Sequence, residues 1–272
     1  MKNSLLTMEK VKPRVHSALY WTLADMLILA KRQLMHIPRN PQELVTATLE
    51  PALILVFFRY IFGGAVAVPG TSYVNYLIGG MLVMSVVLGS AYTGVGIATD
   101  LQHGLVDRFR SLPMAKSAVL TGRTLADLVL STFIILIVWA VGLLIGFRPE
   151  GTILVWLAAL GLLMLSSFMF SWISAFLGLA LNSVEAVTSA VSIYAFLLLF
   201  VSGAFVPTNT MPGWLRPFAE HQPVSLLINA IRGLVLNHPD TTATWQAIVW
   251  CVGLLTLFIP LSVWAYGRRT AK

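Results

Sequence analysis

Five long stretches of this chain carry no charged side chain, and they restrict its possible folds more than any other feature. They are residues 60–99, 128–147, 151–184, 186–215 and 241–267. Each could hold at least one membrane-crossing helix, because about 20 apolar residues in a helix span the roughly 30 Å hydrocarbon layer of a bilayer. Lipid offers no hydrogen-bond partner to the backbone, and a helix satisfies its own N–H and C=O groups. The sequence therefore predicts an all-α, polytopic membrane protein.

The composition agrees with a membrane location. Hydrophobic residues make up 57% of the 272 residues and charged residues 11%, too little polar surface for a water-soluble protein. Alternating strands of about ten residues, which a membrane β-barrel would need, are absent from the sequence. The first 17 residues are polar and basic and have no apolar core, so a cleaved secretory signal is not expected.

Six transmembrane helices are predicted from the apolar stretches. They are placed at residues 44–66, 74–99, 119–146, 152–181, 186–206 and 243–267. This divides the chain into a cytoplasmic N-terminus at 1–43, a six-span domain at 44–267 and a short cytoplasmic tail at 268–272. Within the six-span domain, residues 100–118 form a cytoplasmic loop, and residues 207–240 form an external segment before the last span.

The basic residues predict the orientation of these spans, because cytoplasmic flanks carry an excess of Lys and Arg. Seven precede the first span, four lie between or beside the second and third spans, and three close the chain, so that 14 of 18 share one side. The remaining four are Arg59, Arg148, Arg216 and Arg232. Both termini are therefore expected in the cytoplasm of a bacterial cell, with the chain in its inner membrane. The net charge of +7 then reflects topology and attraction to anionic lipid headgroups, and nucleic-acid binding is not needed to explain it.

An amphipathic helix is predicted before the first span, at residues 18–36. Its apolar residues recur at helical spacing, at positions 19, 23, 26, 27, 30 and 34. Trp21 lies near one end and Lys31 and Arg32 near the other, while Asp25 lies mainly on the polar side. Such a helix is expected to lie along the membrane surface.

The cytoplasmic loop that begins at Asp100 is predicted to contain a short helix parallel to the membrane. Its apolar side comprises Leu101, Leu105, Phe109 and Leu112, and Pro113 ends it. Two interpretations stay open from the residues alone. The helix is either a contact site for another protein or a solvated connector between two spans.

The external segment is interrupted by prolines. They are Pro207, Pro212, Pro217 and Pro223. The mostly apolar stretch from Val224 to Leu236 has 13 residues, too few to cross a bilayer. It is predicted to be a short re-entrant or interfacial helix.

The sequence offers no catalytic or metal-binding pattern. The five histidines, at positions 16, 36, 103, 221 and 238, show no paired metal-ligand spacing, so no metal site is expected. Neither a phosphate-binding loop with Lys-Ser/Thr nor a Gly-x-Ser-x-Gly elbow occurs. Asp127 follows Arg123 by four residues, where a helix-face ion pair is the default account. Arg59 lies within the first span, where it either reaches an interface or marks a polar pathway.

Three stretches together resemble the membrane subunit of type-2 ABC exporters, and specifically the daunorubicin-resistance permease family. In the cytoplasmic loop the similarity lies in Gly104, Arg108 and the Leu-Pro pair at 112–113. The other two stretches are the external sequence at 202–225 and Tyr60–Ala65 at the end of the first span. The similarity runs in order along nearly the whole chain.

The resemblance implies a dimer of six-span subunits, formed with a second copy or a homologous permease, and two separate cytoplasmic ABC ATPase subunits. ATP and Mg would be bound by those ATPases, with no cofactor and no catalytic residue in this chain. The cytoplasmic loop becomes a coupling helix, and the helix at 18–36 becomes the family's elbow helix. The implied coupling residues are Leu101, Gly104, Leu105, Arg108, Phe109, Leu112 and Pro113; those of the elbow are Trp21, Asp25, Lys31 and Arg32; those of the external segment are Pro207, Pro212, Trp214, Gln222 and Pro223.

The function implied is export of a hydrophobic or amphiphilic drug or lipid from the cytoplasm or the inner leaflet. Alternatives are a proton-coupled drug antiporter working through Asp127 or Glu50, an exporter of a polysaccharide or glycolipid, and a membrane scaffold that transports nothing. The residues alone do not name the substrate, because cavity shape rather than a few charges selects large apolar compounds.

Overall fold

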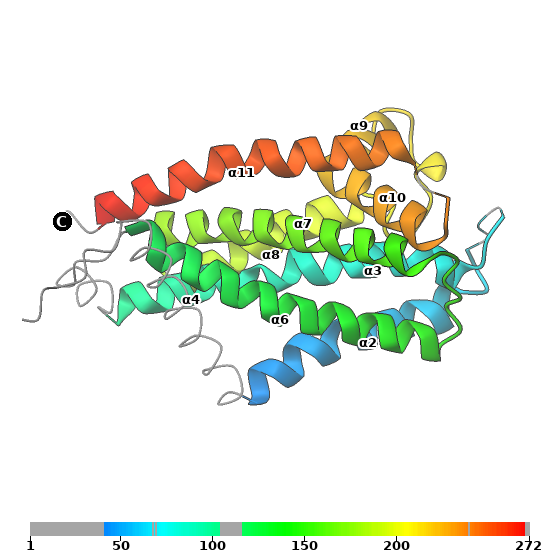
Figure 1. Ribbon diagram of the computed structural model, residues 1–272, viewed down its shortest axis with the longest axis horizontal. Helices are drawn as coiled ribbons and strands as arrows, with labels where there is room; N and C mark the ends of the chain where they lie inside the picture. Colours follow the sequence, from blue (N-terminus) through cyan, green and yellow to red (C-terminus); the bar gives the residue numbers. More distant parts are fainter. Residues whose placement is uncertain (1–40, 67, 69, 104–115, 239, 270–272) are drawn as a thin grey trace, which may run out of the picture.

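The computed structural model describes residues 41–66, 68, 70–103, 116–238 and 240–269 as a bundle of helices, with no strand among them. The long helices run lengthwise, and two short helices, α9 and α10, lie together at one end (Figure 1). The helices are α2 (Pro41–Phe62), α3 (Tyr73–Gly89), α4 (Ala91–Gln102), α6 (Lys116–Leu144), α7 (Ile153–Ala180), α8 (Val184–Phe200), α9 (Arg216–His221), α10 (Pro223–Val235) and α11 (Thr241–Arg269). A 3-10 turn, η2, covers Thr208–Thr210.

The described part contains five helical segments that are long and apolar enough to cross a bilayer. They are Val45–Phe62, Tyr73–Gln102, Leu120–Leu144, Ile153–Ala180 and Thr241–Arg269. The prediction of an all-helical polytopic protein is confirmed. The second predicted span corresponds to α3 and α4 together, which meet at Ser90; its N–H still donates to the Val86 carbonyl at 3.1 Å.

The fifth predicted span ends earlier than expected. Helix α8 has 17 residues, about 26 Å at roughly 1.5 Å per residue, and it stops at Phe200 rather than at 206. The chain then turns, and the side chains of Tyr73 and Tyr76 donate to the carbonyls of Phe205 and Gly203 at 3.2 and 2.7 Å. These two bonds hold the chain after α8 against α3. The prediction erred because apolar composition does not reveal such a tertiary contact.

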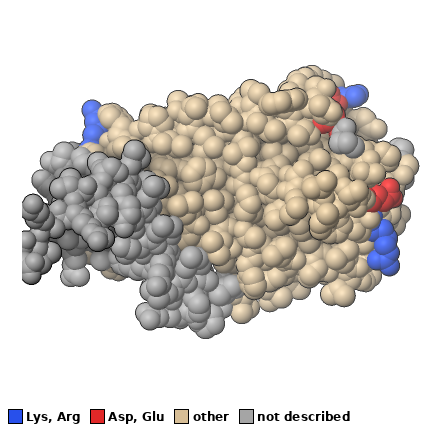
Figure 2. Space-filling model, in the orientation of Figure 1, with Lys and Arg blue, Asp and Glu red and all other residues tan. Residues whose placement is uncertain are grey.

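Helix α7 forms the centre of the bundle and contacts α3, α4, α6, α8, α10 and α11. Its buried side chains include the largest of the core, Trp172 and Phe170, together with Leu163 and Met169. Helices α2 and α11 lie at the periphery and expose large apolar residues such as Leu53 and Val249. Charged side chains gather at the two ends of the face in Figure 2, and the middle of that face carries none. Such an uncharged belt suits a lipid surrounding.

Segments that are distant in sequence meet at each end of the bundle. At the end that we call the α4 end, α4, α7 and α11 terminate and α6 and α8 begin, as the bonds from Arg123 to Asp100 and from Arg269 to Leu181 show. At the opposite end, the α10 end, the Glu150 N–H donates to the Val235 carbonyl. The loops therefore group as the predicted topology requires.

Candidate functional site

Helices α4 and α7 cross with their backbones in direct contact. A Cβ added to Gly178 would collide with the carbonyl oxygen of Gly94, and one added to Gly94 would lie 2.7 Å from the carbonyl oxygen of Ser174. Each side of this crossing has two small residues four positions apart: Ser174 with Gly178 in α7, and Gly94 of α4 with Ser90, the residue just before α4. Small residues at this spacing let helix backbones approach closely in membranes. The sequence interpretation missed this site, and the small-x-x-x-small spacing is the signal that would have found it.

A cluster of three hydroxyl groups lies beside this crossing. The Ser90 Oγ is 3.0 Å from the Ser174 Oγ and 2.9 Å from the Tyr194 hydroxyl, and Ser174 and Tyr194 are 3.1 Å apart. The cluster joins the junction of α3 and α4 to α7 and α8. Each hydroxyl finds its partner inside the protein, as a lipid surrounding requires.

At the α4 end, an ion pair links α4 to α6. Arg123 Nη1 lies 2.9 Å from Asp100 Oδ2, and the guanidinium packs against Gly96, which has no side chain to displace it. The pair is partly buried, with 14% of the Arg123 side chain and 39% of the Asp100 side chain exposed. Asp127, only 7% exposed, accepts a hydrogen bond from Thr93 at 2.5 Å. Arg123, which the sequence paired with Asp127 on the same helix, thus reaches across to α4.

Asp100, Leu101 and Gln102 form the last turn of α4 rather than a separate helix. This corrects the predicted start of the loop helix, because the helical hydrogen bonds of α4 continue through this turn and the His103 N–H still donates to Thr99. Leu101 is half-buried at a small cavity of about 150 Å³, lined also by Leu181, Asn182 and Arg269. The other coupling residues, Gly104, Leu105, Arg108, Phe109, Leu112 and Pro113, and the elbow residues Trp21, Asp25, Lys31 and Arg32, lie outside the described residues.

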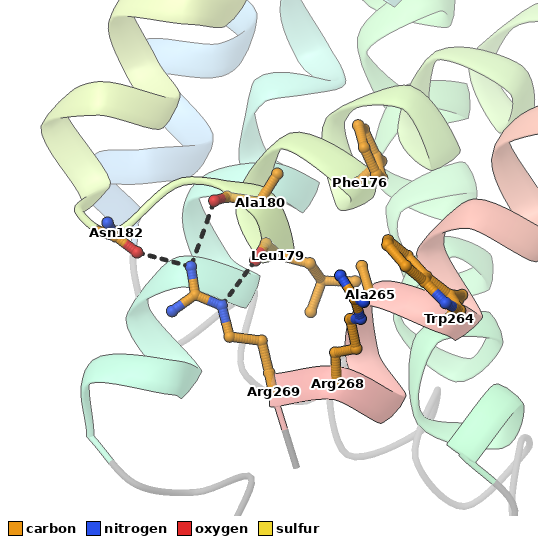
Figure 3. A pocket seen from close by; sticks show the side chains of 8 residues that line it. All are labelled: Phe176, Leu179, Ala180, Asn182, Trp264, Ala265, Arg268 and Arg269. Atoms are coloured by element: carbon orange, nitrogen blue, oxygen red, sulfur yellow. Dashed lines mark hydrogen bonds between the residues drawn. The ribbon is translucent and has the colours of Figure 1, made fainter. Parts of the chain in front are cut away.

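A larger cavity opens beside it at the α4 end, between α7 and α11. Its volume is about 610 Å³, and Figure 3 shows its lining: Phe176, Leu179, Ala180, Asn182, Trp264, Ala265, Arg268 and Arg269. Arg269 donates from Nε to Leu179 and from Nη2 to the carbonyls of Ala180 and Leu181 and to Asn182 Oδ1, at 2.7 to 3.3 Å. It thereby satisfies carbonyls at the C-terminus of α7, where a cation is favourable. Arg268 stacks over Trp264, with Cζ 4.3 Å from a ring centroid.

At the α10 end, Arg232 holds three elements together. Its Nη2 donates to the Gly203 carbonyl at 2.9 Å, its Nε donates to the Tyr76 carbonyl at 3.1 Å, and its Cζ lies 3.6 Å from the centroid of the Tyr76 ring. The Cα of Ala204 would lie only 2.8 Å from a Cβ on Gly80, so the turn after α8 packs on α3 without a side chain between them. The sequence interpretation assigned Arg232 to this end but missed its contacts.

The predicted external residues lie at the same end but play different parts. Pro207 and Pro212 flank η2, and Pro223 opens α10. Gln222 is buried and donates from Nε2 to the Leu198 carbonyl at 2.8 Å, which ties the start of α10 to α8. Trp214 is 80% exposed. The prediction of short helices in this segment is confirmed, and α10 matches the predicted 13-residue helix to within one residue.

Nearby, Arg216 donates from Nε to Glu220 at 2.7 Å on the surface of α9, and this hydrogen bond lowers the pKa of the Glu220 carboxyl.

Arg59 lies in the last turn of α2, and its Nη1 would be 2.7 Å from a Cβ on Gly63 just beyond the helix. Of the two predicted roles, this position favours the interface. Within the described ranges, no three His, Cys, Asp or Glu side chains gather as a metal site would need.

The helical bundle, its uncharged belt and its polar ends define a polytopic membrane protein. Residues 24–236 match the family model of the ABC-2 type transporter, and the chain belongs to this family. It is therefore the membrane permease subunit of an ABC transporter, a class of protein that works with ABC ATPase partners.

Three relatives illustrate the similarity. A daunorubicin resistance ABC transporter permease protein, DrrB1, from Streptomyces coeruleorubidus is 35% identical over 243 residues, which cover 88% of this chain and 85% of the relative. A probable doxorubicin resistance ABC transporter permease protein, DrrC, from Mycobacterium tuberculosis is 25% identical over 92% of this chain and 90% of the relative. A putative transport permease, ycf38, from Cyanophora paradoxa is 24% identical over 79% and 75%.

Proposed function

We propose that this permease exports a hydrophobic or amphiphilic drug, with energy from ATP hydrolysed by partner subunits. The observation that carries the proposal is the similarity to DrrB1, whose name gives daunorubicin resistance, over 88% of the chain. The charge-poor spans support it, because mostly apolar side chains suit contact with an apolar cargo.

The assembly proposed is a pair of permeases, either two copies or this chain with a homologous one, on two ATPase subunits that bind ATP and Mg. The α4 end would face the cytoplasm of a bacterial cell. The elbow residues at 18–36 would help seat the ATPase, and the external segment would cap the exit side. The excess of Lys and Arg in the segments that join the α4 end supports this orientation.

The contacts of α4 support a route for mechanical coupling. Residues 104–115 follow directly after the last turn of α4, which is joined to α6 by the pair of Asp100 and Arg123. The same helix touches α7 backbone to backbone at Gly94 and Gly178. A displacement of the loop by an ATPase would therefore move α4 with α7, since a packed crossing without intervening side chains has little room to yield.

Arg108→Ala tests the coupling role of the loop. In the reconstituted complex with its ATPase, we expect doxorubicin-stimulated ATP hydrolysis and doxorubicin transport to fall by about tenfold or more. A charge-assisted contact across an interface contributes roughly 1.5–3 kcal/mol, so its loss has an effect of this size. ATP hydrolysis is measured as phosphate release, and transport is measured in proteoliposomes from the intrinsic fluorescence of doxorubicin.

Arg148→Ala, at the α10 end, is the matched control and should leave both rates unchanged. A protonophore added at constant ATP should also leave transport intact, because the alternative antiporter through Asp127 or Glu50 would lose its driving force. Normal hydrolysis and transport in Arg108→Ala would refute the coupling role, and transport abolished by the protonophore would refute the ATP-driven mechanism.

Single-cysteine labelling tests the orientation. Cys251 is the chain's one cysteine and is buried, so new cysteines at exposed positions dominate the reaction with a maleimide. We expect Trp214→Cys to react with a membrane-impermeant maleimide in intact cells, and His103→Cys to react only in inverted vesicles. The opposite pattern would place the α4 end outside the cell and overturn the proposed attachment of the ATPase.

A further inference from the structure

The cavity between the ends of α7 and α11 combines apolar walls with two arginines that form no ion pair within the described part of the chain. Phe176, Leu179, Trp264 and Ala265 supply the apolar surface, and Arg268 and Arg269 supply two cations. No Asp or Glu is among the lining residues, and neither ion pair found in the described residues involves these arginines. A ligand for this cavity should therefore carry negative charge next to an apolar part.

The two arginines differ in how many guanidinium N–H donors are free to bind a ligand. Arg269 uses Nε and Nη2 on carbonyls and Asn182, and in Figure 3 only its third nitrogen, Nη1, has no hydrogen bond to the residues drawn. Its charge is partly offset by the carbonyl end of α7. Arg268 makes only its stacking contact with Trp264 among the described residues, which leaves the donors of its guanidinium edge open. Arg268 is thus the principal anion-binding group.

The position of the cavity selects among anions. It lies where the apolar segments Ile153–Ala180 and Thr241–Arg269 both end, which is the depth of lipid headgroups. Trp264 is 54% exposed and Leu257 is 53% exposed. Leu257 precedes Trp264 by seven residues on α11, so it lies on the same face two helical turns deeper. An acyl chain can lie along this face while its phosphate reaches the arginines.

We propose that this cavity binds the phosphate headgroup of one anionic phospholipid, such as phosphatidylglycerol, in the leaflet at the α4 end. The bound lipid is a resident of the site and not the exported cargo. It would brace the end of α11 against α7, next to the turn of α4 that leads into the loop. Basic clefts between membrane helices are suited to anionic headgroups, and an arginine stacked on an aromatic ring keeps its fork oriented toward a phosphate.

Native mass spectrometry of the purified full chain, equilibrated with equal amounts of phosphatidylglycerol and phosphatidylcholine, tests the proposal. We expect the wild type to retain phosphatidylglycerol preferentially, and Arg268→Gln to lower that preference about fivefold, the effect of one arginine near a lipid surface. Arg148→Gln, an exposed arginine at the opposite end, is the matched control and should leave the preference unchanged. Arg269 is left in place because it caps α7.

A second measurement locates the lipid. Phosphatidylglycerol with brominated acyl chains should quench the tryptophan fluorescence of the wild type more than brominated phosphatidylcholine does. This difference should disappear in Trp264→Phe. Equal retention of the two lipids by the wild type, or equal losses in Arg268→Gln and Arg148→Gln, would overturn the proposal. Displacement of phosphatidylglycerol by millimolar inorganic phosphate would show an anion site without lipid and would overturn it as well. None of these results bears on export, so the two proposals fail independently.

Discussion

Gly178→Ala should destabilise the protein by about 1–3 kcal/mol, the usual cost of overpacking a tight core. The added methyl group would collide with the carbonyl oxygen of Gly94, which belongs to the backbone of α4 and cannot rotate away. The two helices would have to separate, and the hydroxyl cluster of Ser90, Ser174 and Tyr194 beside them would stretch. The measurement is the apparent Tm in detergent, together with ATP hydrolysis by the assembled transporter.

Gly161→Ala is the control for this substitution, because it lies in the same helix and a Cβ there meets no atom within 4 Å. It should be neutral or stabilise the protein by up to about 1 kcal/mol, since alanine is the better helix former. The two variants add the same methyl group to α7 and differ only in what it meets. Equal Tm values for both would show that the crossing of α4 and α7 is looser than the structure describes.

Arg232→Met should destabilise the α10 end by roughly 2–4 kcal/mol. Methionine keeps much of the volume but loses hydrogen bonds to the carbonyls of Gly203 and Tyr76 and the stacking on the Tyr76 ring. Hydrogen bonds from charged donors contribute about 1.5–3 kcal/mol each. Part of their loss is offset because the variant no longer has to bury a cation. The turn after α8 should loosen, which limited proteolysis between residues 201 and 215 would detect beside a lower Tm.

Arg232→Lys separates charge from geometry in this prediction. The compact ammonium group of lysine cannot reach both carbonyls and also cover the ring. The stability of Arg232→Lys should therefore fall between those of the wild type and Arg232→Met. Arg216→Met provides the control at the same end, because its pair with Glu220 is exposed and its loss should not change the Tm. A Tm for Arg232→Met as high as that of this control would contradict the anchoring role.

The long apolar stretches predicted most of the lengthwise helices well because one physical requirement governs them. A span must be uncharged and about 20 residues long, and α6, α7 and α11 meet that requirement with boundaries within three residues of those predicted. The 13-residue helix before the last span was recognised for the same reason, since it is apolar and too short. The orientation predicted from counting Lys and Arg stays a prediction, because a bundle whose described helix ends lie at two ends is compatible with either orientation.

The predicted and observed ends of α8 differ because a local pattern cannot show distant partners. The stretch from Val201 to Val206 is as apolar as a helix end, but side chains from α3 and α10 bind its carbonyls. The pairing of Arg123 illustrates the same limit. The four-residue spacing along α6 predicted a pair with Asp127, whereas in the folded bundle Oδ2 of Asp100 on α4 lies 2.9 Å from Nη1 of Arg123.

The amino-acid sequence alone determined that this chain is helical, lies in a membrane, and resembles an ABC permease. Hydropathy, length and charge act residue by residue, so they can be evaluated without knowing the fold. Only the tertiary structure decided which helices touch through glycine, where Arg232 and Arg269 place their guanidinium groups, and that a cationic cavity opens between α7 and α11. These features depend on contacts between residues 29 to 156 positions apart, and such contacts form only when the helices pack.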